Sequence, residues 1–172
     1  NQAQTSWATQ VGYTKPQYSL SAMVNLKYNG WSDSYFGTSN GIARSGGANS
    51  TNIGLRAWWR PQETGTATPS ISVGYDTSEI DGASSGQSTT DMIFVGLNWA
   101  DMFTADDKIG LAVGQPQTRE DESVDPFDYE AYYQYNVNDE TTLRTTVFGN
   151  SDRDGTAGND NTGVVVETTF KF

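Results

Sequence analysis

The sequence contains neither cysteine nor histidine. Without cysteine there is no disulfide framework and no thiolate zinc site. Without histidine there is no Ser–His or Cys–His catalytic pair, and a metal ion would need oxygen ligands. Adjacent carboxylates occur in expected loops such as 120–122, where solvated charge is the simpler interpretation. The residues therefore give no support for an enzyme.

Basic residues are also scarce, because 10 Lys and Arg stand against 21 Asp and Glu, for a net charge of -11. This balance argues against nucleic acid binding, which needs a basic face. No run approaches the ~18 consecutive apolar residues of a transmembrane helix. No signal-peptide pattern opens the chain. Asn1 is therefore expected either to follow a processing site or to begin a piece of a longer protein.

The sequence is instead rich in alternation. Apolar and polar residues alternate with a period of two in about nine runs, and helical periodicity is nowhere sustained. Gly, Ser, Asn, Asp and Thr fill the gaps between runs. The pattern predicts one all-β domain over residues 1–172. The expected strands are 5–13, 18–28, 51–60, 70–76, 91–99, 108–114, 127–137, 141–149 and 162–172.

The gaps between runs alternate in length. Four are short or moderate (14–17, 61–69, 100–107 and 138–140), and four are longer (29–50, 77–90, 115–126 and 150–161). This alternation predicts an up-and-down antiparallel meander with tight turns at one end and long loops at the other. Outer-membrane β-barrels have this asymmetry.

Each run has one apolar and one polar side. In 18–28, for example, Leu20 and Val24 share one side, whereas Ser21 and Asn25 share the other. A soluble β-sandwich also alternates in this way, with its apolar side inward. Aromatic residues near the ends of the runs favour two girdles at membrane interfaces. The girdle residues are Tyr13, Tyr18, Tyr28, Trp59, Trp99, Phe127, Phe170 and Phe172.

Three stretches carry a resemblance to a known family: DKIGLAVGQP (107–116), DYEAYYQYNVNDETTL (128–143) and TGVVVETTFKF (162–172). Together they resemble the C-terminal part of the carbohydrate-selective porin (OprB-like) family, particularly the cyanobacterial major outer-membrane porins. Where that family usually has a proline soon after the turn in the second stretch, this chain has Arg144. The ending also resembles the outer-membrane sorting signal, so we expect Phe172 to engage the assembly machinery.

The resemblance implies a transmembrane antiparallel up-and-down β-barrel of about 16 strands in the bacterial outer membrane. Membrane lipids and lipopolysaccharide would surround this barrel. A homotrimer is one assembly that the resemblance allows. An odd number of strands cannot close with every pair antiparallel, and an open edge in lipid is costly. The chain is therefore expected to be the C-terminal part of a larger barrel, incomplete on its N-terminal side.

The polar positions predict the lining of a pore. In a barrel, the lumen wall would carry Lys27, Arg56, Arg60, Lys108, Arg144 and Lys171, against Asp76, Asp128, Glu130 and Glu167. Lys27 and Arg56 are expected to be about 6–8 Å apart, which predicts a weak anion preference that salt screens. In the alternative interpretation, the pairs Arg144–Glu130 and Lys171–Glu167 neutralise one another.

Two further features stay open. Trp58, Tyr132 and Phe148 would project into the lumen, where Trp58 and Tyr132 could stack on sugars or simply fill space. Asp152, Asp154 and Asp160 in the loop 150–161 could bind calcium or be a solvated acidic loop. No other cofactor is expected.

The function predicted from the sequence is a porin, a passive diffusion channel for small hydrophilic solutes or ions. A glycan-binding β-protein without a pore, soluble or on the cell surface, is the first alternative. A small complete barrel of about ten strands, acting as an adhesin or structural protein, is the second. Dependence on detergent separates the porin from the first alternative.

Overall fold

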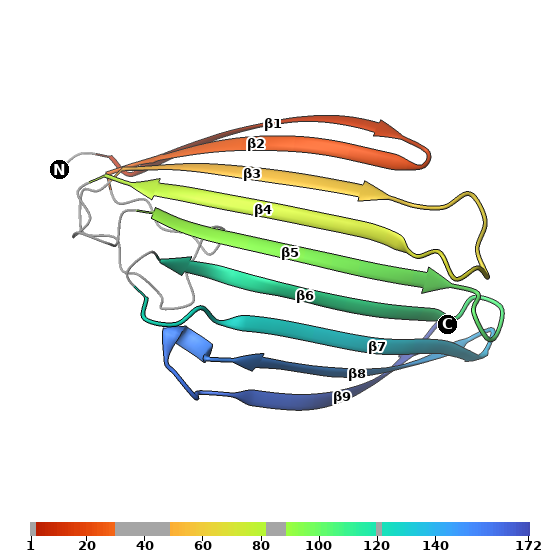
Figure 1. Cartoon of the computed structure of the whole chain (residues 1–172). Helices are drawn as coiled ribbons and strands as arrows, with labels where there is room; N and C mark the ends of the chain where they lie inside the picture. The colour runs from red at the N-terminus through yellow and green to blue at the C-terminus, as the bar shows by residue number, and fades with distance from the viewer. Residues whose placement is uncertain (1–2, 30–48, 82–88, 120–121) are drawn as a thin grey trace.

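The computed structural model describes residues 3–29, 49–81, 89–119 and 122–172 and confirms the all-β prediction (Figure 1). A single 3₁₀ turn, η1 (Arg153–Gly155), precedes the last strand. None of the helical segments in these ranges has the length and apolar composition that crossing a membrane requires. The described residues form nine strands: β1 (Thr5–Lys15), β2 (Tyr18–Tyr28), β3 (Ser50–Trp59), β4 (Ser70–Ile80), β5 (Thr89–Ala100), β6 (Lys108–Arg119), β7 (Phe127–Asn138), β8 (Thr141–Ser151) and β9 (Asn161–Phe170).

The strands form one sheet in sequence order, with every neighbouring pair antiparallel. Figure 1 shows them side by side from β1 in red to β9 in blue. The sheet is open, because β1 and β9 are its two edges and do not pair with each other. The chain ends beside the tight β7–β8 turn, where the Lys171 N–H donates to the Glu140 carbonyl at 2.8 Å.

Several strand boundaries differ from the prediction. β4 continues to Ile80, β5 begins at Thr89 and β6 continues to Arg119, so residues 77–80, 89–90 and 115–119 of the expected loops are strand. The predicted alternation of short and long connections is therefore wrong, since the connection 60–69, expected to be the shorter, is longer than the connection 81–88. Polar composition suggested loops there, but these residues continue the backbone ladder. The last strand also stops at Phe170 rather than Phe172.

The register keeps the two predicted faces apart across the whole sheet. Apolar residues lie opposite apolar residues, as in the pairs Tyr18–Trp59, Val73–Val95 and Leu97–Leu111. Register shifts occur between Asp91 and Ile93 and between Asn136 and Asn138, both near strand ends. Because side chains alternate along a strand, one unbroken register gives one apolar face and one polar face.

Burial on these faces is the reverse of that in a soluble protein. Among the described residues, Ile80 is the one aliphatic side chain that is buried. Polar residues of the opposite face are buried instead, including Asn52 at 0% and Thr90 at 1% exposure. On the apolar face, Leu20 is 57% and Leu55 46% exposed. The sheet therefore shelters its polar face and presents its apolar face outward.

The β5–β6 turn, residues 101–107, is organised around one buried carboxylate. Asp107 accepts N–H bonds from Met102 (2.7 Å), Phe103 (3.0 Å) and Thr104 (3.2 Å) and a hydroxyl bond from Tyr133 (3.1 Å). Burial alone would raise the pKa of Asp107, but these donors together outweigh it and hold the pKa below its usual value. The ionised carboxylate thus stabilises the turn.

We expect Asp107→Asn to lower the temperature of unfolding at neutral pH. A group whose pKa is depressed by folding contributes stability above its unfolded-state pKa, about 4, and loses it as pH falls through the folded value. The difference between wild type and variant should therefore shrink below pH ~4. Thermal unfolding in detergent across this range checks it, with the exposed Asp106→Asn as control. Parallel pH curves for wild type and Asp107→Asn would contradict this role.

Candidate functional site

On the polar face, a few large side chains pack over glycines of the neighbouring strands. Phe94 of β5 lies directly between Gly74 of β4 and Gly114 of β6. A Cβ atom added to Gly74 would come within 2.1 Å of the Phe94 ring. Tyr132 occupies the space above Gly110 in the same way, at 2.0 Å. A side chain at either glycine would therefore displace the neighbouring ring.

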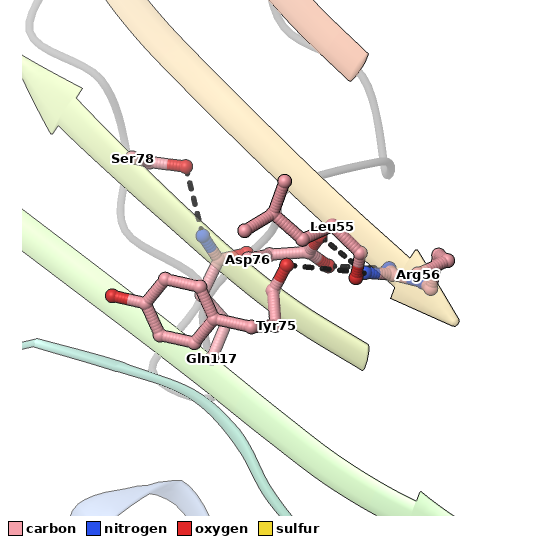
Figure 2. Close-up of polar contacts among 6 residues, drawn as sticks. All are labelled: Leu55, Arg56, Tyr75, Asp76, Ser78 and Gln117. Carbon is pink, nitrogen blue, oxygen red and sulfur yellow. Dashed lines mark hydrogen bonds and ion pairs between the residues drawn. The ribbon is translucent and has the colours of Figure 1, made fainter. Parts of the chain in front are cut away.

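An arginine–aspartate pair joins β3 and β4 on this face, and Figure 2 shows its contacts. Arg56 Nη1 and Nη2 each donate to one carboxylate oxygen of Asp76, both at 2.7 Å. Arg56 Nη1 also donates to the carbonyls of Leu55 (2.9 Å) and Tyr75 (3.2 Å). The guanidinium lies 5.5 Å from the centroid of the Phe94 ring. This bidentate geometry fixes both side chains and neutralises both charges.

A second arginine is held in a comparable way on β8. Arg144 Nη2 donates to Glu130 Oε1 at 3.0 Å, and its Nε lies 3.9 Å from Glu167. The guanidinium is 4.0 Å from the centroid of the Tyr132 ring, within the range of a cation–π contact. The Tyr132 hydroxyl in turn accepts a hydrogen bond from Asn98 Nδ2. One arginine thereby joins side chains of β7, β8 and β9.

At the end of the sheet opposite the two-residue β1–β2 and β7–β8 turns, buried amides bridge the strands. Asn52 Nδ2 donates to the Asn25 carbonyl at 3.0 Å. Gln117 Nε2 donates to Ser78 Oγ at 2.9 Å and to Thr90 Oγ1 at 2.7 Å (Figure 2 includes Ser78 and Gln117). Buried polar groups need such partners. This part of the face is thus a polar layer over five neighbouring strands, in which these bonds join β2 with β3 and β4 with β5 and β6. Asn52 Oδ1 is buried there without a hydrogen-bond partner among the described residues.

The structure places the predicted pore-lining residues on this polar face. The register puts Arg56 opposite Gly74, Lys108 opposite Gln134 and Arg144 opposite both Gln134 and Glu167. The predicted Arg144–Glu130 pair is confirmed. The ion pair of Glu167 is with Arg144 rather than with the expected Lys171.

The prediction that Lys27 and Arg56 form one patch is wrong. Lys27 lies opposite Ser50, whereas Arg56 lies opposite Ser21. Six residues of strand separate these levels, or about 20 Å. Lys27 is also buried, at 1% exposure. Residues on adjacent strands are neighbours only when the register places them at the same height along the strands. The sequence between β2 and β3 does not indicate that register.

The predicted lumen aromatics lie on the polar face, and Phe94 joins them. Trp58 lies opposite Ser72, with the Arg60 guanidinium 5.6 Å from its ring centroid. Tyr132 packs on Gly110 and beneath Arg144, contacts that match the space-filling interpretation. Sequence reasoning missed Phe94 because the surrounding run, Met92–Trp99, is nearly continuously apolar and hides the alternation.

The predicted girdle residues lie at strand ends on the apolar face. Tyr18 and Tyr28 begin and end β2, Trp59 ends β3, and Phe127 begins β7. Trp99, next to the end of β5, donates from Nε1 to the Ala67 carbonyl at 2.9 Å. Phe103 in the β5–β6 turn adds an aromatic residue at this end of the sheet, and its ring centroid lies 6.0 Å from that of Tyr133. The prediction omitted Phe103 because it lies in a connection.

The acidic loop before β9 uses its carboxylates internally. Asp152 Oδ1 accepts the Gly158 N–H at 2.7 Å, and Asp160 Oδ1 accepts the Asp152 N–H at 3.1 Å. The Asp154 side chain lies outside the described residues. Within the described part of the chain, no group of three or more potential ligands could hold a metal ion.

In comparisons with known proteins, no family model, curated protein or solved structure matched this chain. The functional argument therefore depends on the geometry of the two faces.

We expect Arg56 and Asp76 to be energetically coupled. In a double-mutant cycle with Arg56→Ala and Asp76→Ala, the coupling should reach about 1–2 kcal/mol, because the carboxylate is buried and the contact is bidentate. Arg144→Ala with Glu130→Ala is the matched comparison, and its more exposed pair should give under ~1 kcal/mol. Urea unfolding in detergent measures both. Equal coupling in the two cycles would contradict the expectation.

Proposed function

We propose that this chain forms part of the wall of a β-barrel porin in the bacterial outer membrane, through which small hydrophilic solutes or ions diffuse passively. The observation that carries the proposal is the reversed burial of the sheet, with apolar side chains outward and polar side chains sheltered. A soluble sandwich would bury the apolar face against a second layer. A barrel in lipid needs apolar residues outside and polar residues toward a water-filled lumen.

The dimensions of the apolar face support the proposal. Tyr18 and Tyr28 lie on this face at the two ends of β2. Their separation along the strand is about 34 Å at ~3.4 Å per residue. A strand tilt of about 40° would reduce this to a height of about 26 Å, which matches the apolar band of outer-membrane barrels.

The open edges favour a larger barrel. Nine alternating strands leave β1 and β9 running in the same direction. Closure with every pair antiparallel therefore takes an odd number of additional strands. An unpaired edge in lipid leaves backbone groups unsatisfied, at several kcal/mol each. We infer that further strands complete the barrel, in agreement with the ~16 strands that the family resemblance implies.

The chain terminus fits the same proposal. Phe170 ends β9 on the apolar face, and Phe172 follows it with its side chain fully exposed. We place the end of the sheet with the two-residue β1–β2 and β7–β8 turns on the periplasmic side, where outer-membrane barrels have short turns. These aromatics then lie at the periplasmic interface, and Phe172 is available to the assembly machinery. The polar face would line the solute path, with Arg56 and Arg144 already paired to carboxylates.

Conductance tests this function. The purified protein, added in detergent to a planar lipid bilayer, should give discrete conductance steps, whereas a sample unfolded by heating before addition should give none. The folded protein should also need detergent to stay in solution and should migrate differently on a gel after heating. A protein that stays soluble without detergent, gives no conductance and binds glycans would be the non-porin alternative.

A further inference from the structure

A polar depression of about 460 Å³ lies on the polar face, at the end of the sheet that carries the two-residue β7–β8 turn. Lys108 begins β6 and lies opposite Gln134 of β7. One level further toward the turns, cross-strand pairs of polar side chains span β7, β8 and β9. The lining side chains that carry further hydrogen-bond donors are Lys108, Gln134, Asn136, Thr169 and Lys171, and Thr142 lies among them.

The two lysines differ from the arginines of the same face. Arg56 and Arg144 are committed to carboxylates. In the described part of the chain, neither Lys108 nor Lys171 makes an ion pair. The nearest carboxylate to Lys171 along β9 is that of Glu167. It lies beside Arg144, at 3.9 Å from Nε.

Two of the three aspartates in the adjoining β5–β6 turn already accept hydrogen bonds from the backbone. Asp107 is buried and accepts three backbone N–H groups. Asp101 accepts the Asp106 N–H at 2.7 Å. Asp106 itself is exposed and also lines the depression, so its carboxylate is the one group there that would oppose an anion.

The amide orientation adds donors. Thr142 Oγ1 donates to Asn136 Oδ1 at 2.9 Å, which leaves the Asn136 NH₂ group to donate elsewhere. Two ammonium groups, side-chain amides and hydroxyls suit a ligand with several negatively charged oxygens better than a single-point halide.

We propose that this depression binds a small oxyanion of the inorganic phosphate class. Its role as a periplasmic-side anion site in a solute path rests on the proposed function, but the binding itself does not require a closed pore. The sequence alone predicts that Lys27 and Arg56 attract anions. That role falls instead to Lys108 and Lys171 at the turn end.

The test is a titration of the detergent-purified protein with inorganic phosphate, followed by isothermal titration calorimetry. We expect saturable binding that weakens as sodium chloride is raised. Lys108→Gln with Lys171→Gln should weaken it about tenfold or more. Asp106→Asn should tighten it about twofold, because a like charge is removed. The matched control is Lys15→Gln, a turn-end lysine on the apolar face, which should leave binding unchanged.

The result that would overturn the proposal is phosphate binding that does not saturate, or binding that is equal in wild type and the lysine double variant when circular dichroism shows both folded. If the double variant fails to fold, Lys108→Arg with Lys171→Arg must retain binding and Asp106→Asn must tighten it. Binding to phosphatidylglycerol micelles but not to free phosphate would assign the site to a lipid headgroup and also overturn it. If the protein binds phosphate but gives no conductance, the result would contradict the proposed porin function and not the phosphate site.

Discussion

The hydrogen-bonded register between neighbouring strands is the constraint on which the rest of this structure depends. A shift of one residue in any pair would carry every apolar side chain of a strand to the polar side. The two register shifts lie beside Asp91 and Asn136, near strand ends, so the stretch between the aromatic rows stays continuous. That continuity produces one apolar surface over nine strands and, on the reverse side, one continuous polar surface.

The polar surface is built so that its charges and rings are held in place. Glycines provide the room, since Phe94 and Tyr132 lie across Gly74 and Gly110 and leave no space for a side chain there. The rings lie near Arg56 and Arg144, whose guanidinium groups are paired with carboxylates. A wall of this kind presents fixed, largely neutralised groups to the lumen that we propose. At the turn end, Lys108 and Lys171 line the depression that we propose as an anion site.

Alternation alone predicted the nine strands and the faces of most of them, because period-two patterning is a local signal that the backbone ladder preserves. It did not predict the full lengths of β4, β5 and β6 or the position of Phe94 on the polar face. Other features depend on information that no single run contains. The level of Lys27 relative to Arg56 is set by pairing across β2 and β3, and the sequence between those strands does not encode it. Asp107 looked like one acid among three in a turn, and only folding surrounds it with backbone donors. Thr77–Ile80 has loop-like composition but continues β4.

Adjacent residues on one strand test the orientation of the two faces most directly. Since the chain has no cysteine, Ser72→Cys and Val73→Cys each introduce a unique site for a nitroxide spin label. Power-saturation electron paramagnetic resonance in liposomes then compares collisions with oxygen, which partitions into lipid, and with a water-soluble nickel complex. The label at 73 should respond to oxygen and be shielded from nickel, and the label at 72 should show the reverse. Equal accessibility at both positions, or the opposite preference, would contradict a membrane-facing apolar surface.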